Sequence, residues 1–463
     1  MPGFVPSGFK MRSAPGSSQG FHSGTRISTD TNQVNLRNAA RPSRQFPAVC
    51  FSFWLALDGY LVFADGPLDP DLMKRQTSLL LVALALAGLV ASCAHGPRDH
   101  ASPNPAKAAA VAGIIQTEQI RLAPDLHLAV FAVDFRFDDG SVVLDGEVDN
   151  PAAKSEVEEA VRRAGFPVAN RITLLPAAAL GETNWGITTL SVANGREQPE
   201  HKAELGTQTL MGEVVRVLKR NGRWLLVQSH DQYLSWLESG SLKLCTRTEA
   251  DAWAQSSLLI VTELDALIRA TPEPVGSPVS DVVIGCRVKQ VGEIGAWFQV
   301  ELPDGRAGYL PKASATDYAA WQKSRRPTPE NIEQVGQQFI GRPYLWGANT
   351  PRGLDCSGFT KLTFFLNGIE LPRNASQQAR AGVEVPLDRD YSQLKKGDLL
   401  FFGFEGRGER PGRVSHTGIY LGNKLFIQSS QRVRLSSLDP QSPIADPARI
   451  RGLIKVRRVL PDE

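Results

Sequence analysis

Residues 341–366 read GRPYLWGANTPRGLDCSGFTKLTFFL and place Cys356 at the start of a predicted helix. Asp355, just before it, is a residue type that caps helix N-termini. Apolar side chains then recur at the spacing of one helical face, at Phe359, Leu362 and Leu366. A thiol in the first turn lies near the positive end of the helix dipole and near free backbone N–H groups, and both favour its ionised form. The stretch therefore predicts a nucleophilic cysteine.

A nucleophilic thiol needs a base that takes its proton and later protonates the leaving group. His416 is the only histidine downstream of Cys356, and it lies in an alternating run, residues 415–421, that predicts a strand. A second predicted strand, residues 425–428, ends at Gln428, whose side-chain oxygen can hold the imidazole in the third role of a triad. An incidental buried cysteine with a structural histidine is the alternative interpretation.

Six motifs follow one another in the C-terminal part of the chain. They are GRPYLWG at 341–347, DCSGF at 355–359, LPR at 371–373, SQQ at 376–378, LKKGDLLFF at 394–402 and HTGIYLG at 416–422. As an ordered set they resemble the NlpC/P60 family of papain-like cysteine peptidases. The resemblance implies a peptidase domain over residues 328–458 in an α+β chain, with Cys356 as nucleophile and His416 as base. It also implies that Gln428 takes the place of a third polar residue, often histidine, and that Tyr344 helps to bind the substrate and the oxyanion.

Two β-rich segments precede this domain, over residues 183–246 and 256–316. Short alternating strands with an Asn-Gly turn at 221–222 and an Asp-Gly turn at 304–305 predict small barrels. Both segments resemble bacterial SH3 domains, and we interpret Trp224 and Trp297 as core residues. Two such domains ahead of an NlpC/P60 domain resemble the γ-D-glutamyl-L-diamino acid endopeptidases of the dipeptidyl-peptidase VI type, which trim peptidoglycan stem peptides.

This second resemblance implies a cleft in which the first SH3-like domain binds the free amine of an N-terminal L-Ala. Tyr233 and Glu213 match the residues of that wall. Asp355, Ser357 and Arg373 match residues around the L-Ala-γ-D-Glu portion. Asn374 is a departure, because the subgroup has Asp there and a charge-assisted contact to the ammonium is lost. Strict specificity for a free amine therefore does not follow from the resemblance, whereas the catalytic class does.

The N-terminal region predicts export. Residues 73–92 carry a basic start, an apolar run and small residues before Cys93, a pattern that resembles a bacterial lipoprotein signal. Cleavage before Cys93 and lipid on its thiol imply a membrane anchor on the periplasmic face of the cell envelope, and a plain signal peptide is the alternative. Because signals begin at the N-terminus, we expect Met73 to be the true start and residues 1–72 to be a non-native extension. The two residues after the cysteine, Ala94-His95, lack the Asp that often marks inner-membrane retention, which favours the outer membrane.

Two further segments lie between the signal and the barrels. Residues 93–119 contain an Ala- and Pro-rich stretch and predict a tether. Residues 120–178 predict a small α/β unit, with a strand over 126–135 and a helix over 151–164. This unit resembles a BON-type module, and a family-specific spacer is the alternative.

The charge balance and the cysteine and histidine content bear on which partners and cofactors we expect. The 51 Lys and Arg residues against 48 Asp and Glu residues give +3, which gives no reason to expect a nucleic-acid partner. No Cys/His cluster has the spacing of a metal site, so we predict no metal and no cofactor. Cys245 and Cys286 either pair in an oxidising compartment or stay buried as free thiols, and the second is favoured.

Together these observations predict a lipid-anchored cysteine peptidase that hydrolyses the γ-D-Glu–L-diamino acid bond of peptidoglycan stem peptides. An endopeptidase acting on polymeric peptidoglycan is the first alternative. A non-catalytic wall-binding lipoprotein is the second, and the presence of Cys356, His416 and Gln428 argues against it.

Overall fold

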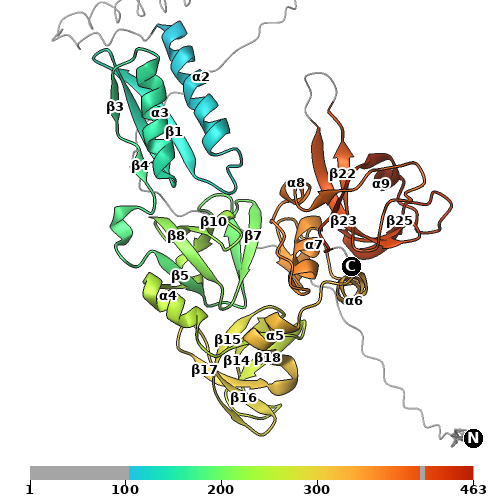
Figure 1. Ribbon diagram of the computed structural model, residues 1–463. Coiled ribbons are helices and arrows are strands. Elements are labelled where there is room, and N and C mark those ends of the chain that lie inside the picture. Colours follow the sequence, from blue (N-terminus) through green and yellow to red (C-terminus); the bar gives the residue numbers. More distant parts are fainter. Residues whose placement is uncertain (1–103, 407–411, 462–463) are drawn as a thin grey trace, which may run out of the picture. The chain divides into compact units, whose positions relative to one another are not determined.

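The computed structural model describes residues 104–406 and 412–461, which belong to one compact unit of the chain. An α/β unit is followed by two antiparallel sheets and a mixed domain (Figure 1), so the predicted α+β class is confirmed. The predicted extension over 1–72, the signal over 73–92 and Cys93 lie outside the described residues. No helix within the described ranges is long and apolar enough to span a bilayer.

The N-terminal unit begins with helix α2 (Pro105–Leu122), capped by Asn104, whose side chain accepts the N–H of Ala106 at 3.0 Å. The tether predicted over residues 93–119 is therefore wrong from residue 105 onward. An asparagine cap, a proline in the first turn and several alanines all favour a helix. Val111 and Ile115 are buried, so packing holds the helix in place.

The rest of this unit is a four-stranded sheet on which α2 and α3 (Pro151–Arg163) pack. Its strands are β1 (Phe131–Asp138), β2 (Ser141–Val148), β3 (Val168–Asn170) and β4 (Thr173–Leu174). β1 pairs with β2 as an antiparallel hairpin, and β3 and β4 run parallel to β2. Because β1 starts only at Phe131, the chain from residue 123 to residue 130 is an irregular connection rather than the start of the predicted strand.

Two SH3-like antiparallel sheets of seven strands each follow. The first contains β5 (Trp185–Thr188), β6 (Val192–Arg196), β7 (Leu205–Leu210), β8 (Val214–Asn221), β9 (Trp224–Gln228), β10 (Leu234–Glu238) and β11 (Leu242–Cys245). The second contains β12 (Leu258–Val261), β13 (Asp265–Arg269), β14 (Pro278–Val283), β15 (Arg287–Ile294), β16 (Trp297–Glu301), β17 (Ala307–Pro311) and β18 (Ala315–Asp317). Helix α4 (Arg247–Ala254) connects the two sheets, and helix α5 (Tyr318–Ser324) follows the last strand of the second sheet. Short 3-10 turns are η1 (Ala178–Leu180), η2 (Ser239–Ser241) and η3 (Lys312–Ser314).

The two tryptophans predicted as core residues differ. Trp224 is buried in a small cluster with Leu218 and Trp236. Trp297 is only half-buried, so its assignment to the core is wrong. It opens β16 just after a turn and pairs with Ile294, which is itself exposed, so this end of the hairpin lies at the surface.

The C-terminal domain packs helices on a six-stranded sheet of order β21-β26-β22-β23-β24-β25. Its helices are α6 (Pro329–Gln337), α7 (Cys356–Phe365), α8 (Ala375–Gln378) and α9 (Pro447–Gly452). The sheet strands are β21 (Val383–Glu384), β22 (Leu399–Phe404), β23 (Arg413–Gly422), β24 (Leu425–Ser430), β25 (Arg432–Ser437) and β26 (Leu453–Arg458), and a small hairpin is formed by β19 (Asn349–Thr350) and β20 (Gly353–Leu354). Helix α7 packs on β23 and β24.

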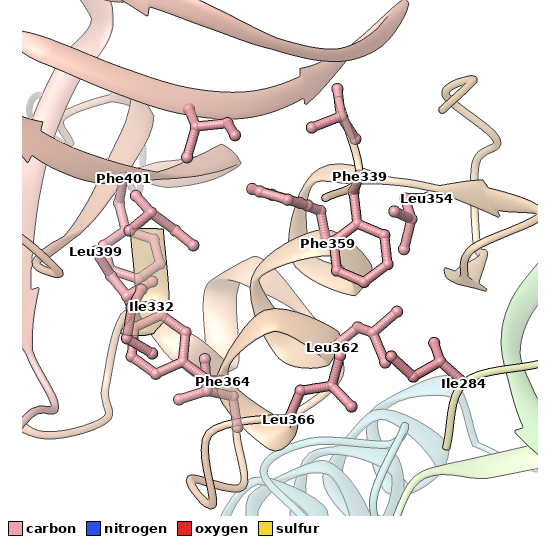
Figure 2. Packing of buried hydrophobic residues seen from close by; sticks show 14 of the residues in the cluster. Ile284, Ile332, Phe339, Leu354, Phe359, Leu362, Phe364, Leu366, Leu399 and Phe401 are labelled. Carbon is pink, nitrogen blue, oxygen red and sulfur yellow. The ribbon is translucent and has the colours of Figure 1, made fainter. Parts of the chain in front are cut away.

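Helix α7 is buried along its length from Cys356 to Phe364, not on one face as its apolar spacing predicts. Figure 2 shows apolar side chains on more than one side of it, with Phe339 beside Phe359 and with Leu362 facing Ile284, which lies in the turn after β14. Ile260 on β12 of the second SH3-like sheet belongs to the same cluster. The core of the C-terminal domain therefore includes a residue of that sheet.

Polar residues of α7 are also buried, and each of two has a partner. The hydroxyl of Thr360 donates to Gln378 Oε1 at 2.7 Å, and the ammonium of Lys361 donates to the backbone oxygen of Leu371 at 2.6 Å. Because these polar groups are bonded, the helix can be covered on all sides at low cost.

Cys245 and Cys286 are both buried free thiols, which settles the alternative of a disulfide between them. The Cys286 thiol donates to the backbone oxygen of Ser191 at 3.3 Å. Burial raises the pKa of Cys245 to about 11 and that of Cys286 to about 12, so both are inert structural thiols.

Candidate active site

Cys356 lies at a helix start that is fixed by close contacts. Asp355 caps α7, as predicted: its Oδ1 accepts the N–H of Gly358 at 2.6 Å and its Oδ2 accepts the N–H of Gly347 at 3.0 Å. Gly358 leaves no room for a side chain, because a Cβ there would lie 2.2 Å from the backbone oxygen of Ala348. The first turn of α7 is thereby held, and with it the thiol, which is 6% exposed.

The surroundings of Cys356 act on the ionisation of its thiol in opposite directions. Burial, together with the Asp355 carboxylate, raises the pKa of the thiol to about 11. Hydrogen bonds from the backbone N–H groups of Thr417 and Ser357 lower the pKa without reversing this. Burial therefore opposes the ionisation that the helix dipole and the N–H groups favour, because removal from water disfavours the charged form.

His416 reaches the site on β23. The N–H of the next residue, Thr417, bonds to the Cys356 sulfur, so the strand brings His416 into the neighbourhood of the thiol. The imidazole is buried and its centroid lies 5.7 Å from that of the Phe402 ring. Burial, together with the nearby cation of Arg449, lowers the pKa of His416 to about 3. The imidazole rests neutral and is able to accept a proton.

Gln428 on β24 is fully buried, and its Oε1 lies 2.6 Å from His416 Nε2. The Gln428 amide nitrogen donates to Ser436 Oγ at 2.8 Å and to Asp446 Oδ2 at 3.0 Å. These two acceptors fix which end of the amide faces the imidazole. An oxygen at Nε2 selects the tautomer with its proton there and leaves Nδ1 free to act as the base.

Asp446 and Arg449 complete this network and were not foreseen from the sequence. The Asp446 carboxylate also accepts from Arg434 at 3.1 Å, and Arg449 Nε donates to Gln428 Oε1 at 3.3 Å. An aspartate followed by proline is a sequence signal for a helix N-terminus, and Asp446 does cap α9. Its second role depends on the bridge between the residue before it, Ala445, and Ser437 at the end of β25, which no local pattern encodes.

The thiol opens into a cleft of about 850 Å³. Six of the seven predicted substrate residues line this cleft together with Cys356: Tyr233, Tyr344, Asp355, Ser357, Arg373 and Asn374. The structure thus brings together residues from α7, the start of α8 and the first SH3-like sheet.

A buried ion pair lies in this cleft beside the thiol. Arg373, which is 2% exposed, donates from Nη2 to Asp355 Oδ2 at 2.6 Å and from Nη1 to Ser357 Oγ at 3.0 Å. Tyr344 lies close enough to Cys356 that the charge of the thiolate adds to the effect of burial in raising the pKa of its phenol. The phenol is therefore a hydrogen-bond donor beside the sulfur.

Comparison with known proteins places this site in a family. Residues 341–449 match the model of the NlpC/P60 family, and residues 195–242 match that of the bacterial dipeptidyl-peptidase Sh3 domain. A Bacillus subtilis protein named gamma-D-glutamyl-L-lysine dipeptidyl-peptidase is 32% identical over 231 residues, which span 48% of this chain and 71% of the relative. The chain belongs to the NlpC/P60 family.

Two further similarities cover more of this NlpC/P60 chain. A Bacillus cereus protein of the same name is 29% identical over 56% of this chain and 76% of its own length. The crystal structure of an NlpC/P60 family protein from Bacillus cereus aligns with 60% of this chain and 100% of its own, at 25% identity and a TM-score of 0.52. The similarity therefore extends beyond the peptidase domain into the SH3-like part.

One of the residues predicted to bind the substrate in this NlpC/P60 protein lies outside the cleft. Glu213 does not line the cleft; it pairs with Arg287 at 3.5 Å and borders a separate, smaller cavity with His230. The prediction that Glu213 binds the substrate amine is therefore wrong. It follows Gly212, which adopts a positive φ of +84°.

Glu197 stands in the place expected for that carboxylate. It lines the cleft, and its Oε1 accepts the hydroxyl of Tyr233 at 3.2 Å. The pairing of Trp236 on β10 with Arg196 on β6 brings the two residues together, although they are 36 positions apart. Nothing in the local sequence around Glu197 marks it, because the signal lies in the strand pairing.

Proposed function

We propose that the protein is a cell-wall hydrolase that cleaves the γ-D-Glu–L-diamino acid bond of peptidoglycan stem peptides, with Cys356, His416 and Gln428 as its triad. The observation that carries the proposal is the cleft, because Cys356 lines it together with Tyr233 and Glu197 from the first SH3-like segment. Such a site suits a short peptide whose amine meets the carboxylate while its amide bond meets the thiol. The names of the two Bacillus relatives support this substrate class.

The proposed reaction starts from a neutral pair. As the Cys356 sulfur attacks the carbonyl carbon, its proton passes to His416 Nδ1, and Gln428 Oε1 stabilises the imidazolium through Nε2–H. The tetrahedral oxyanion is held by the Tyr344 phenol and by backbone N–H groups at the start of α7. His416 then gives the proton to the leaving amine, the C–N bond breaks, and water hydrolyses the thioester with His416 as base.

Recognition of the substrate is assigned to two ends of the cleft. Glu197 and Tyr233 receive the amine of the N-terminal residue, because a carboxylate paired with a phenol is an acceptor for an ammonium group. Asp355, Ser357 and Arg373 contact the L-Ala-γ-D-Glu portion. The Arg373 Nε is buried without a hydrogen-bond partner within the described residues.

Location and domain organisation are also proposals. We assign residues 328–458 to a papain-like peptidase domain and residues 183–246 and 256–316 to SH3-like barrels. Residues 120–178 are assigned to a module of BON type. Lipid on Cys93 would anchor the protein to the envelope with the cleft on the periplasmic side, as the peptidoglycan substrate requires.

Mass spectrometry of purified protein with L-Ala-γ-D-Glu-L-Lys, its diaminopimelate counterpart and intact sacculi tests the function. We expect release of the L-Ala-D-Glu dipeptide from the free tripeptides, and no release by a Cys356→Ala variant. Release of soluble fragments from sacculi, with both tripeptides left intact, would overturn the proposal in favour of an endopeptidase on polymeric peptidoglycan. No hydrolysis of any of them by the wild-type protein would favour a non-catalytic wall-binding protein.

A further inference from the structure

The N-terminal α/β unit contributes a residue to the catalytic cleft. His127, in the connection between α2 and β1, lines the cleft together with Glu197, Tyr233 and Cys356. Its ring stacks on that of Tyr233, with centroids 5.6 Å apart and an interplanar angle of 25°. This unit lies outside both segments that match family models, residues 195–242 and 341–449. A part of the chain outside these matches therefore borders the amine end of the site.

The connection is attached to both neighbouring domains. On the SH3-like side, the N–H of Leu234 donates to the backbone oxygen of His127 at 2.7 Å, and Gln228 Nε2 donates to that of Leu128 at 3.0 Å. On the peptidase side, Gln377 Nε2 donates to Asp125 Oδ2 at 2.9 Å. Bonds on both sides hold His127 at a defined place in the cleft.

The same attachment reaches position 374. Gln377, which binds Asp125, also accepts the backbone N–H of Asn374 through Oε1 at 3.0 Å. Asn374, which stands where the dipeptidyl-peptidase VI type has aspartate, is thus connected to the N-terminal unit through Gln377. The neutral Asn374 and His127 both line the cleft and both contact Tyr233, Asn374 by a side-chain hydrogen bond and His127 by ring stacking.

His127 also separates the cleft from a second space. A pocket of about 230 Å³ lies next to the cleft, lined by apolar residues that include Leu126, Phe131 and Trp236. His127 and Glu197 line both spaces and form the partition between them. Without the imidazole, the amine end of the cleft would continue into this apolar pocket.

We infer that His127 is a specificity-determining residue that ends the cleft at the amine subsite, so that the N-terminal unit selects stem peptides with a free N-terminal amine. The inference rests on the proposed function. His127 Nδ1 lies 3.1 Å from Asp125 Oδ1, so its proton is directed there and Nε2 is left as an acceptor. An ammonium group donates to that nitrogen and to Glu197. An acylated amine carries no charge and needs the space that the ring occupies.

Two substitutions separate the two roles of His127. His127→Phe keeps the ring and its stacking on Tyr233 but removes the acceptor nitrogen, and His127→Ala removes both. His201 offers a matched control, because it is an exposed histidine that packs edge-on against Trp224 and does not border the cleft. The measurements are kcat/KM for L-Ala-γ-D-Glu-L-Lys and its N-acetyl form, and the Kd of both peptides for each variant in a Cys356→Ala background.

We expect His127→Phe to lower kcat/KM for the free peptide roughly tenfold or more, the size of one lost hydrogen bond to a charged group, with the acetylated peptide still excluded. His127→Ala should in addition raise use and binding of the acetylated peptide. His201→Ala should leave both values as in the wild type. If wild-type protein cleaves the free peptide but both His127 variants keep its free-to-acetylated ratio, the inference is overturned while the proposed function stands. If neither peptide is cleaved or bound by any form of the protein, both fall.

Discussion

The resting charge state of Cys356 gives a prediction that can be measured without any substrate. A thiol with a pKa of about 11 is ionised to about 3 parts in 10,000 at about pH 7.5. Since the thiolate is the form that reacts with alkylating agents, modification of Cys356 should be slow at this pH. The rate should rise about tenfold for each pH unit, with no plateau below about pH 10.

The assay is iodoacetamide labelling at a series of pH values, with Cys356 followed by peptide mass spectrometry. Cys245 and Cys286 serve as buried thiols in the same sample, and a His416→Gln variant shows whether the imidazole contributes. A labelling rate at Cys356 that is already at its plateau near neutral pH would refute the reasoning. It would mean that Cys356 and His416 rest as a thiolate–imidazolium pair, and that burial does not dominate at this site.

Three further predictions concern the network, the amine subsite and the anchor. Gln428→Ala should lower kcat about ten- to a hundredfold with little change in KM, because a hydrogen bond to a charged imidazolium is worth about 1.5–3 kcal/mol. Steady-state kinetics on the tripeptide would measure both values. A higher KM with an unchanged kcat would indicate a structural role for Gln428 instead. Glu197→Gln should reduce the ratio of kcat/KM for the free peptide to kcat/KM for the N-acetylated peptide, whereas Glu213→Gln should leave this ratio unchanged. The opposite result would indicate that Glu213, and not Glu197, binds the substrate amine. Cys93→Ser should move the protein from the membrane pellet to the soluble fraction on fractionation, and retention in the pellet would contradict lipid anchoring at this residue.

The parts of the site that the sequence predicts are those with local signals. Asp355 before Cys356 is a helix cap in sequence and in structure. The contact between Gln428 and His416 follows from two strands joined by a short turn, where pairing needs no long-range information. The peptidase and first SH3-like segments likewise have ordered motifs that the family matches cover.

The parts that the sequence did not predict depend on packing between distant segments. Glu197 becomes a neighbour of Tyr233 only when β6 pairs with β10, and Asp446 reaches Gln428 only when the chain before α9 is bridged to the end of β25. His127 enters the cleft because a connection of the N-terminal unit is bonded to Leu234. The pKa of Cys356 likewise depends on more than local sequence: the helix dipole is local, whereas the burial that raises the pKa comes from the whole fold.

The packing of Leu362 on Ile284 has a consequence for how this chain can be divided. Ile260 on β12 of the second SH3-like sheet and Ile284 in the turn after β14 belong to the same buried cluster as Phe359 of the nucleophile helix. A peptidase domain cut free at residue 328 would present that apolar surface to water and lose part of the support beneath Cys356. The second SH3-like sheet is thus a structural half of the enzyme rather than a detachable targeting module, and grafting the catalytic domain onto another carrier would require its underside to be redesigned.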